Sequence, residues 1–262
     1  MKIRIMAVFG LGLSLSAAQA QTTFSIGPRV GGGVASGTFT GFDQLTTTPK
    51  AGDYTYSRSS VAGYQLGLTA SIGSGHLAFQ PSLLYTSKGV KQLGSASDNS
   101  NGVQSKITLD VTSRINYLEL PLNVVYSLGD DGQGFQLFAG PYVAFGIGGK
   151  ADYKLDASSN GPGIPFSDSG SRSYEFGNTF VDPDPNGTST KFVADARARR
   201  FDAGLNAGVG YRVGPVQAQL GYGLGLVNVQ PDYPASYKQD NSTGYNRSVQ
   251  LSVAYLFSAG GR

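Results

Sequence analysis

The residues best suited to acid–base, nucleophilic or metal chemistry are scarce in this sequence. His76 is the only histidine, and there is no cysteine. Catalytic triads need an imidazole that takes a proton from the nucleophile, and zinc sites are built mainly from histidine and cysteine. "DPDPNG" at Asp182–Gly187 begins like a calcium loop, but its twelfth position is Val193 instead of a bidentate glutamate, which leaves a turn or, at most, a weak surface calcium site. We therefore expect no enzyme activity, no metal centre and no cofactor.

Charged residues on the polar side of alternating segments are the next candidates. Four of them share an expected inward orientation: Arg29, Glu119, Asp202 and Arg212. Charges in a narrow interior must pair or stay hydrated. The sequence therefore predicts a polar cluster inside the protein, which either plugs the interior or lines a gated path for a small solute.

A basic run, "RARR" at Arg197–Arg200, precedes one of these alternating segments. Its cations, Arg197, Arg199 and Arg200, are expected at an outer rim. Guanidinium groups bind phosphate well, so the run would contact lipopolysaccharide phosphates or, alternatively, remain a set of ordinary rim charges.

The elements that hold these residues are predicted to be long β-strands. Residues 201–226, "FDAGLNAGVGYRVGPVQAQLGYGLGL", alternate between apolar and polar or glycine on both sides of Gly214-Pro215. Period-two alternation places the two sets on opposite faces of a strand, whereas a helix would mix them. Each strand is roughly a dozen residues, close to the length that a tilted strand needs to cross a bilayer.

The same alternation recurs along the chain and predicts eight strands. They lie at about 24–38, 61–72, 77–85, 118–126, 135–147, 201–213, 216–226 and 249–257. The connections alternate between short turns (73–75, 129–134, 214–215) and long polar loops (39–60, 88–113, 152–199, 228–247). Proline cannot donate to a strand ladder, so Pro28, Pro81 and Pro141 are each expected to mark a bulge or a strand end.

An even strand count with alternating short and long connections is typical of a transmembrane barrel. An unpaired backbone group in hydrocarbon costs several kcal/mol, so a sheet in a membrane has to close on itself. The predicted fold class is all-β: an eight-stranded antiparallel up-and-down transmembrane β-barrel with three short periplasmic turns and four long extracellular loops. Both chain ends would then lie on the periplasmic side.

The composition indicates which face of the strands meets lipid. Only 14% of the residues are charged and 38 are glycine, whereas about a quarter of a soluble domain is charged. The polar face consists mainly of Gly, Gln, Asn and Ser, which suits a crowded interior better than a water-exposed surface. We therefore expect the apolar face to point outward, the inverse of a soluble lipocalin-like binder.

The N-terminus has the pattern of a secretory signal. Lys2 and Arg4 precede the apolar run 5–17, and Ala18-Gln19-Ala20 supplies small residues at the cleavage positions. We expect residues 1–20 to be a signal peptide cleaved after Ala20 and residues 21–262 to be the barrel. Removing two of 20 basic residues leaves 18 against 17 acidic ones, so the sequence gives no reason to expect nucleic-acid binding.

Three short motifs resemble a known family. "YLELPL" at Tyr117–Leu122, "AGPY" at Ala139–Tyr142 and "VQLSVAYLF" at Val249–Phe257 are similar to the small outer-membrane β-barrel family of Bacteroidota, which includes PorT-like and OmpA- or OmpX-like eight-stranded domains. The resemblance implies this fold and an outer-membrane location. It implies no particular activity, because most members of the family have none established. It also implies that Tyr255 and Phe257 form the aromatic signal read by the barrel-assembly machinery.

These observations favour an integral outer-membrane protein that is not an enzyme. Its expected role is structural, or binding and adhesion through the extracellular loops to an unknown ligand, and its expected neighbours are outer-membrane lipid and lipopolysaccharide. A small-solute channel and a soluble exported lipocalin-like binder remain as alternatives.

Overall fold

The computed structural model describes residues 22–39, 53–100, 102–161, 165–179, 196–232 and 243–258. Across these residues the fold is almost entirely β-strand, with one helical turn at Asp130–Gly132. None of the described segments forms a helix long and apolar enough to span a membrane. The predicted signal peptide, 1–20, and the "DPDPNG" segment fall outside the described residues.

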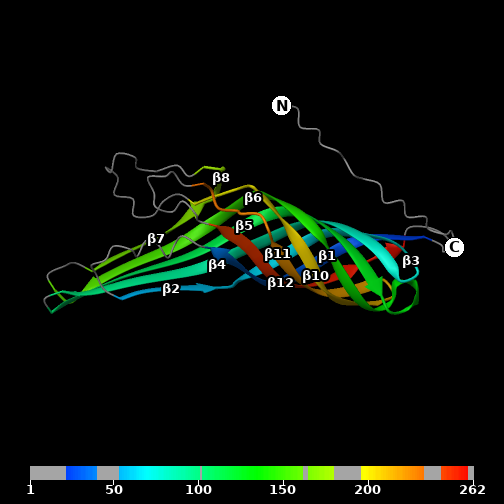
Figure 1. Ribbon diagram of the computed structural model, residues 1–262, viewed down its shortest axis with the longest axis horizontal. Coiled ribbons are helices and arrows are strands. Elements are labelled where there is room, and N and C mark those ends of the chain that lie inside the picture. Colours follow the sequence, from blue (N-terminus) through cyan, green and yellow to red (C-terminus); the bar gives the residue numbers. More distant parts are fainter. Residues whose placement is uncertain are drawn as a thin grey trace, which may run out of the picture.

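Eight of the described strands pair edge to edge into a closed ring (Figure 1). They are β1 (Thr23–Phe39), β3 (Val61–Ser74), β4 (Leu77–Ser100), β5 (Val103–Ser127), β6 (Gly134–Ser159), β10 (Phe201–Val213), β11 (Val216–Gly225) and β12 (Gly244–Tyr255). Each pairs antiparallel with the next in this order, and β12 pairs with β1 to complete the ring. Closure removes the free edges that an open sheet would present. The alternating segments predicted from the sequence all fall on strands of this ring.

Side-chain burial confirms the predicted assignment of the two faces. Leu66 is 58% exposed while its neighbour Gln65 is 5% exposed, and Leu220 is 48% exposed beside Gln219 at 3%. Exposed large apolar side chains continue in this way around all eight strands, and the buried set is rich in Gln, Ser and Thr. The ring is therefore apolar outside and polar inside.

The short turns lie at one end of the ring (Figure 1). The beginning of β1 and the C-terminal end of the last strands lie at the same end. Each of the three short turns contains a glycine in the left-handed region: Gly75 has φ of +59°, Gly132 of +73° and Gly214 of +56°. The two-residue strand β13 (Phe257–Ser258) pairs with Ser25 and Ile26 of β1 at this end.

At the other end, the sheet continues far beyond the ring, where long loops were expected. β3 pairs with β4 only as far as Thr86, but β4 runs on to Ser100, about 46 Å further at the usual rise per residue. β5 and β6 accompany it, and β2 (Asp53–Ser59) and β7 (Phe166–Ser173) add to the two edges. The expectation of a loop over 88–113 is therefore wrong, as is the expectation that the loop 152–199 begins at residue 152. We name the five-stranded sheet β2-β4-β5-β6-β7 the extension.

The extension was missed because its outer face carries little apolar signal. The side chains of β7 alternate Ser167, Ser169, Ser171 and Ser173 on one side, and all four are exposed. β7 therefore lacks the apolar–polar alternation by which the ring strands are recognised. β5 does show it, at Ile107, Leu109 and Val111, and that signal was overlooked.

The three prolines neither end a strand nor shift the register, contrary to expectation. Each lies where the ladder to one neighbour is interrupted: Pro28 beside β12, Pro81 beside β3 and Pro141 beside β5. The register is the same on both sides of each interruption. The missing N–H of each proline thus interrupts pairing to one neighbouring strand over a few residues, while pairing to the other neighbour continues.

Candidate functional site

Four glutamines meet in the interior of the ring, near the end with the short turns. They are Gln80 on β4, Gln136 on β6, and Gln217 and Gln219 on β11. Gln217 donates to the Gln136 side-chain carbonyl at 2.6 Å and to that of Gln80 at 3.3 Å. Gln219 also donates to Gln80 at 3.3 Å. We call these four residues the glutamine layer.

The glutamine layer joins strands on opposite sides of the ring. Three ring strands separate β4 from β11 in either direction, so the Gln80–Gln217 hydrogen bond crosses the full width of the interior. Serine hydroxyls extend the layer, since Gln80 donates to Ser71 at 3.2 Å and Gln136 to Ser127 at 3.0 Å. Most polar groups of these buried amides are paired in this way, while the side-chain oxygen of Gln217 has no hydrogen-bond partner among the described residues.

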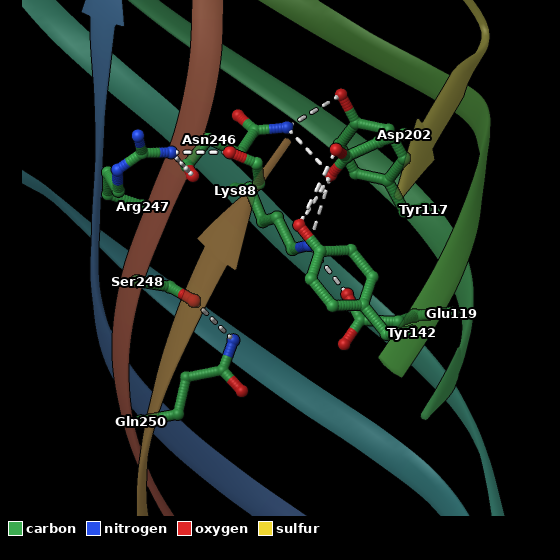
Figure 2. A network of polar contacts seen from close by, with 10 residues as sticks. Lys88, Tyr117, Glu119, Tyr142, Asp202, Asn246, Arg247, Ser248 and Gln250 are labelled. Atoms are coloured by element: carbon green, nitrogen blue, oxygen red, sulfur yellow. Dashed lines mark hydrogen bonds and ion pairs between the residues drawn. The ribbon is translucent and has the colours of Figure 1, made fainter. Parts of the chain in front are cut away.

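A second polar layer lies further toward the extension and is ionic (Figure 2). Lys88 of β4 forms ion pairs with Glu119 of β5 at 2.7 Å and with Asp202 of β10 at 3.3 Å. The Lys88 and Glu119 side chains are 4% and 5% exposed, and Asp202 is fully buried. Buried charges persist only when paired and hydrogen-bonded, and this geometry supplies both.

Aromatic and amide side chains complete the ionic layer. The Tyr142 hydroxyl donates to Asp202 at 3.2 Å, and the Asn246 amide donates to Asp202 at 3.0 Å and to the Tyr117 hydroxyl at 3.4 Å. The Lys88 ammonium also lies 4.2 Å from the Tyr142 ring centroid. Tyr117 is on β5 and Asn246 on β12, which are again opposite strands, so the ionic layer also spans the interior (Figure 2).

Arg29 of β1 connects the two layers. Its guanidinium hydrogen-bonds the Gln219 side-chain carbonyl and lies 3.5 Å from the Ser82 hydroxyl. Arg29 and Glu119 line a cavity of about 40 Å³ between the layers. Two buried cations, Arg29 and Lys88, thus balance two buried anions, Glu119 and Asp202, and the interior is neutral as a whole.

Aromatic rings fill the space left by interior glycines. A β-carbon on Gly208 would lie 2.6 Å from Cζ of Phe138, and one on Gly204 would lie 2.7 Å from Cε1 of Tyr142. Real carbon atoms do not approach that closely, so these positions require glycine. At these two positions, glycine makes room for inward-pointing aromatic rings.

The structure brings together three of the four residues predicted to form the interior cluster. Arg29, Glu119 and Asp202 are buried within or between the two layers. Arg212 is ten residues from Asp202 along β10, or about 33 Å, where its Nε donates to the Gly214 carbonyl at 3.2 Å. Its inclusion in the cluster was wrong, because inward orientation does not specify depth along the strand.

Sequence reasoning missed four members of the ionic layer: Lys88, Tyr117, Tyr142 and Asn246. The signal was present, since Lys88 continues the inward series of β4 two residues beyond Thr86, and Asn246 continues that of β12 two residues before Ser248. Ending the predicted strands at their last apolar residue excluded Lys88, Tyr117 and Asn246. Tyr142 lies within the predicted strand 135–147 but was not considered, because only charged side chains were taken as candidates.

The residues of the predicted basic patch are largely engaged within the protein. Arg197 pairs with Glu175 at 2.6 Å, and Arg199 hydrogen-bonds the Asp232 carboxylate. Arg200 lies over the Phe176 ring, 5.1 Å from its centroid. Arg197 and Phe176 belong to the short parallel strands β9 (Arg197–Ala198) and β8 (Glu175–Phe176), so these contacts hold two connecting segments together.

The remaining predicted residues lie at the end with the short turns. Tyr255 and Phe257 point outward, with exposed fractions of 45% and 57% and ring centroids 4.7 Å apart. Nδ1 of His76 is 2.9 Å from the Ser127 carbonyl oxygen in the turn region. Within the part of the chain that the structure describes, no three His, Cys, Asp or Glu side chains are grouped to hold a metal ion.

A comparison with protein families identifies the chain as an outer-membrane barrel protein. The family model described as "Outer membrane protein beta-barrel domain" matches residues 18–230. Among solved structures, Neisserial surface protein A has 11% identity and a TM-score of 0.28, covering 90% of this chain and 99% of that one. Pseudomonas aeruginosa OccK5 has 10% identity and a TM-score of 0.13, covering 91% and 98%. Such TM-scores do not establish a shared fold, and no curated protein matches. The family match covers most of the chain, and the protein belongs to the outer membrane protein β-barrel domain family.

Proposed function

We propose that this protein is a non-enzymatic, non-conducting barrel of the bacterial outer membrane that holds the extension outside the cell as a binding surface. The observation that carries this proposal is the pair of polar layers, in which hydrogen bonds join opposite strands across the ring. The glutamine layer and the ionic layer thus each cross the lumen, one shortly after the other along the barrel axis. The barrel acts as a rigid membrane support for the extension.

The interior supports a plug and opposes a solute channel. The cavity of about 40 Å³ between the layers has room for a few water molecules at most. The distribution of polarity also opposes a soluble lipocalin-like binder. A lipocalin needs an apolar interior for its ligand and a polar exterior, whereas Leu66, Leu220 and their equivalents point outward here.

The extension supports a binding role because its outer face is polar and charged. Lys91 pairs with Asp110 at 2.8 Å and Lys154 with Asp156 at 2.9 Å, all on one face of the sheet. Hydrogen bonds from Lys154 and Ser167 lower the pKa of the Asp156 carboxyl, which favours its charged form. Such a surface suits a polar ligand or partner.

Several finer expectations belong to this proposal. The short turns would face the periplasm and the extension the outside, after cleavage of the signal following Ala20. The barrel-assembly machinery would read Tyr255 and Phe257, and the resemblance to PorT-like barrels of Bacteroidota concerns fold and location only. Lipid and lipopolysaccharide would surround the apolar face.

Labelling of single cysteines in intact cells tests this orientation, and the chain has no native cysteine to interfere. We expect Ser171→Cys on β7 to react with a membrane-impermeant maleimide in intact cells. Asp131→Cys, in an exposed short turn, should react only after the outer membrane is permeabilised. The reverse pattern, or recovery of the protein in the soluble fraction, would contradict the proposal.

A further inference from the structure

Two cations lie side by side on the outer surface, where the apolar face of the ring gives way to the extension. Arg114 of β5 and Lys150 of β6 are direct register partners, and both are exposed. Toward the ring, the next outward pair is Asn116 with Gly148, and beyond it lie Leu118, Phe145 and Ile147, which are 45%, 51% and 55% exposed. The pair therefore lies at the edge of the apolar surface.

A β-bulge creates this arrangement. Tyr117 pairs with Gly146 and Asn116 pairs with Gly148, so Ile147 is an extra residue in β6. An extra residue reverses the facing of every side chain that follows it. Without the bulge, Lys150 would point into the interior. With it, Lys150 points outward beside Arg114, while Ala151 is buried.

The charge of this pair is incompletely balanced by the protein. Like charges directly opposite each other in a sheet are destabilising, because their β-carbons are about 5 Å apart. The nearest carboxylate is that of Asp152, 3.9 Å from Arg114, and both of these side chains are about half exposed. Lys150 makes no ion pair within 4.0 Å among the described residues, and Asp110 is engaged by Lys91. Two cations thus share one half-exposed carboxylate, and one positive charge is left unbalanced among the described residues.

We propose that Arg114 and Lys150 bind a phosphate group of lipid A in the outer leaflet. This inference rests on the proposed orientation, in which the extension faces outward. The phosphates of lipid A lie immediately above its acyl chains. The cation pair lies one outward register pair, Asn116 and Gly148, beyond the apolar side chains that would meet those chains. A guanidinium and an ammonium together offer the donors and charge that a phosphate requires.

The test is binding of bisphosphorylated lipid A to the full-length protein in detergent with EDTA, measured by native mass spectrometry. Each charge-assisted contact is worth about 1.5 kcal/mol, or roughly tenfold in affinity. We expect Lys150→Gln to weaken binding about tenfold and Arg114→Gln/Lys150→Gln about a hundredfold. Dephosphorylated lipid A should bind the wild-type protein as weakly as the double variant binds lipid A.

The matched control is Lys106→Gln/Lys154→Gln, which removes two exposed cations from the same face farther along the extension. It should bind lipid A like the wild type, and every variant should keep its heat-modifiable gel migration. Equal loss in the control or full binding by the Arg114/Lys150 variant would overturn the inference. Cysteine labelling separates the two proposals. If the extension is labelled from outside the cell but lipid A does not bind, the lipid A site is refuted and the proposed orientation stands.

Discussion

Replacing Lys88 with methionine is expected to lower the free energy of unfolding of the barrel by about 3–5 kcal/mol. The substitution removes the ammonium that lies 2.7 Å from Glu119 and 3.3 Å from Asp202. Both carboxylates are almost fully buried and would be left without their cation. The penalty therefore comes from the two charges that remain and not from the loss of packing, because methionine has a similar length and volume.

Equilibrium unfolding by urea in phospholipid vesicles measures this effect. Lys154→Met is the matched control, because Lys154 is 63% exposed in an ion pair, and its loss should cost at most about 1 kcal/mol. The triple variant Lys88→Met/Glu119→Gln/Asp202→Asn removes all three charges and should recover most of the lost stability. Equal stability of Lys88→Met and the wild type would show that the ionic layer is not formed.

Replacing Gly208 with alanine is expected to cost about 3 kcal/mol or more, because the added methyl group overpacks the interior. Its β-carbon would lie 2.6 Å from Cζ of Phe138 and 2.8 Å from Cα of Gly221. The second contact is with the backbone of the adjacent strand β11, which cannot move aside as a flexible side chain can. The variant should lose heat-modifiable migration at a lower temperature than the wild type.

Gly32→Ala in β1 provides the control for this prediction. Its β-carbon would point outward, with Gly63 O at 3.8 Å as the nearest atom within 4 Å. Alanine there should be neutral or stabilise the barrel by up to about 1 kcal/mol, since it restricts the unfolded chain without a clash. If both substitutions behave alike, Phe138 does not fill the interior as described.

Much of the ring could be predicted from the sequence because the lipid-facing and interior sides of each strand are so different. The alternation between Leu66 and Gln65, or Leu220 and Gln219, predicts a side chain's direction from its type alone. Arg29, Glu119 and Asp202 were identified as interior residues by this parity. The partners of these three residues were not predicted, because contacts across the interior depend on the order of the strands around the ring and on the depth of each residue.

The parts that were not predicted are those where the alternation is absent or interrupted. The extension is polar on its outer face, so nothing in the types of residues 91–100 distinguishes a paired strand from a loop. The bulge at Ile147 changes the facing of Lys150, and the glycines on either side of it, Gly146 and Gly148, were a signal that was not used. The pairing of Arg197 with Glu175 joins residues 22 positions apart and depends on the fold of the connecting segments.

Conductance in planar bilayers tests the sealed interior most directly. The purified wild-type barrel is predicted to insert without producing discrete current steps, because the glutamine and ionic layers both cross the lumen. A variant with Gln80, Gln217 and Gln219 changed to alanine, together with Lys88→Ala, Glu119→Ala and Asp202→Ala, should conduct if it folds, as judged by heat-modifiable migration. Stable, ohmic current steps from the wild-type protein would contradict a closed barrel and would identify the protein as a channel.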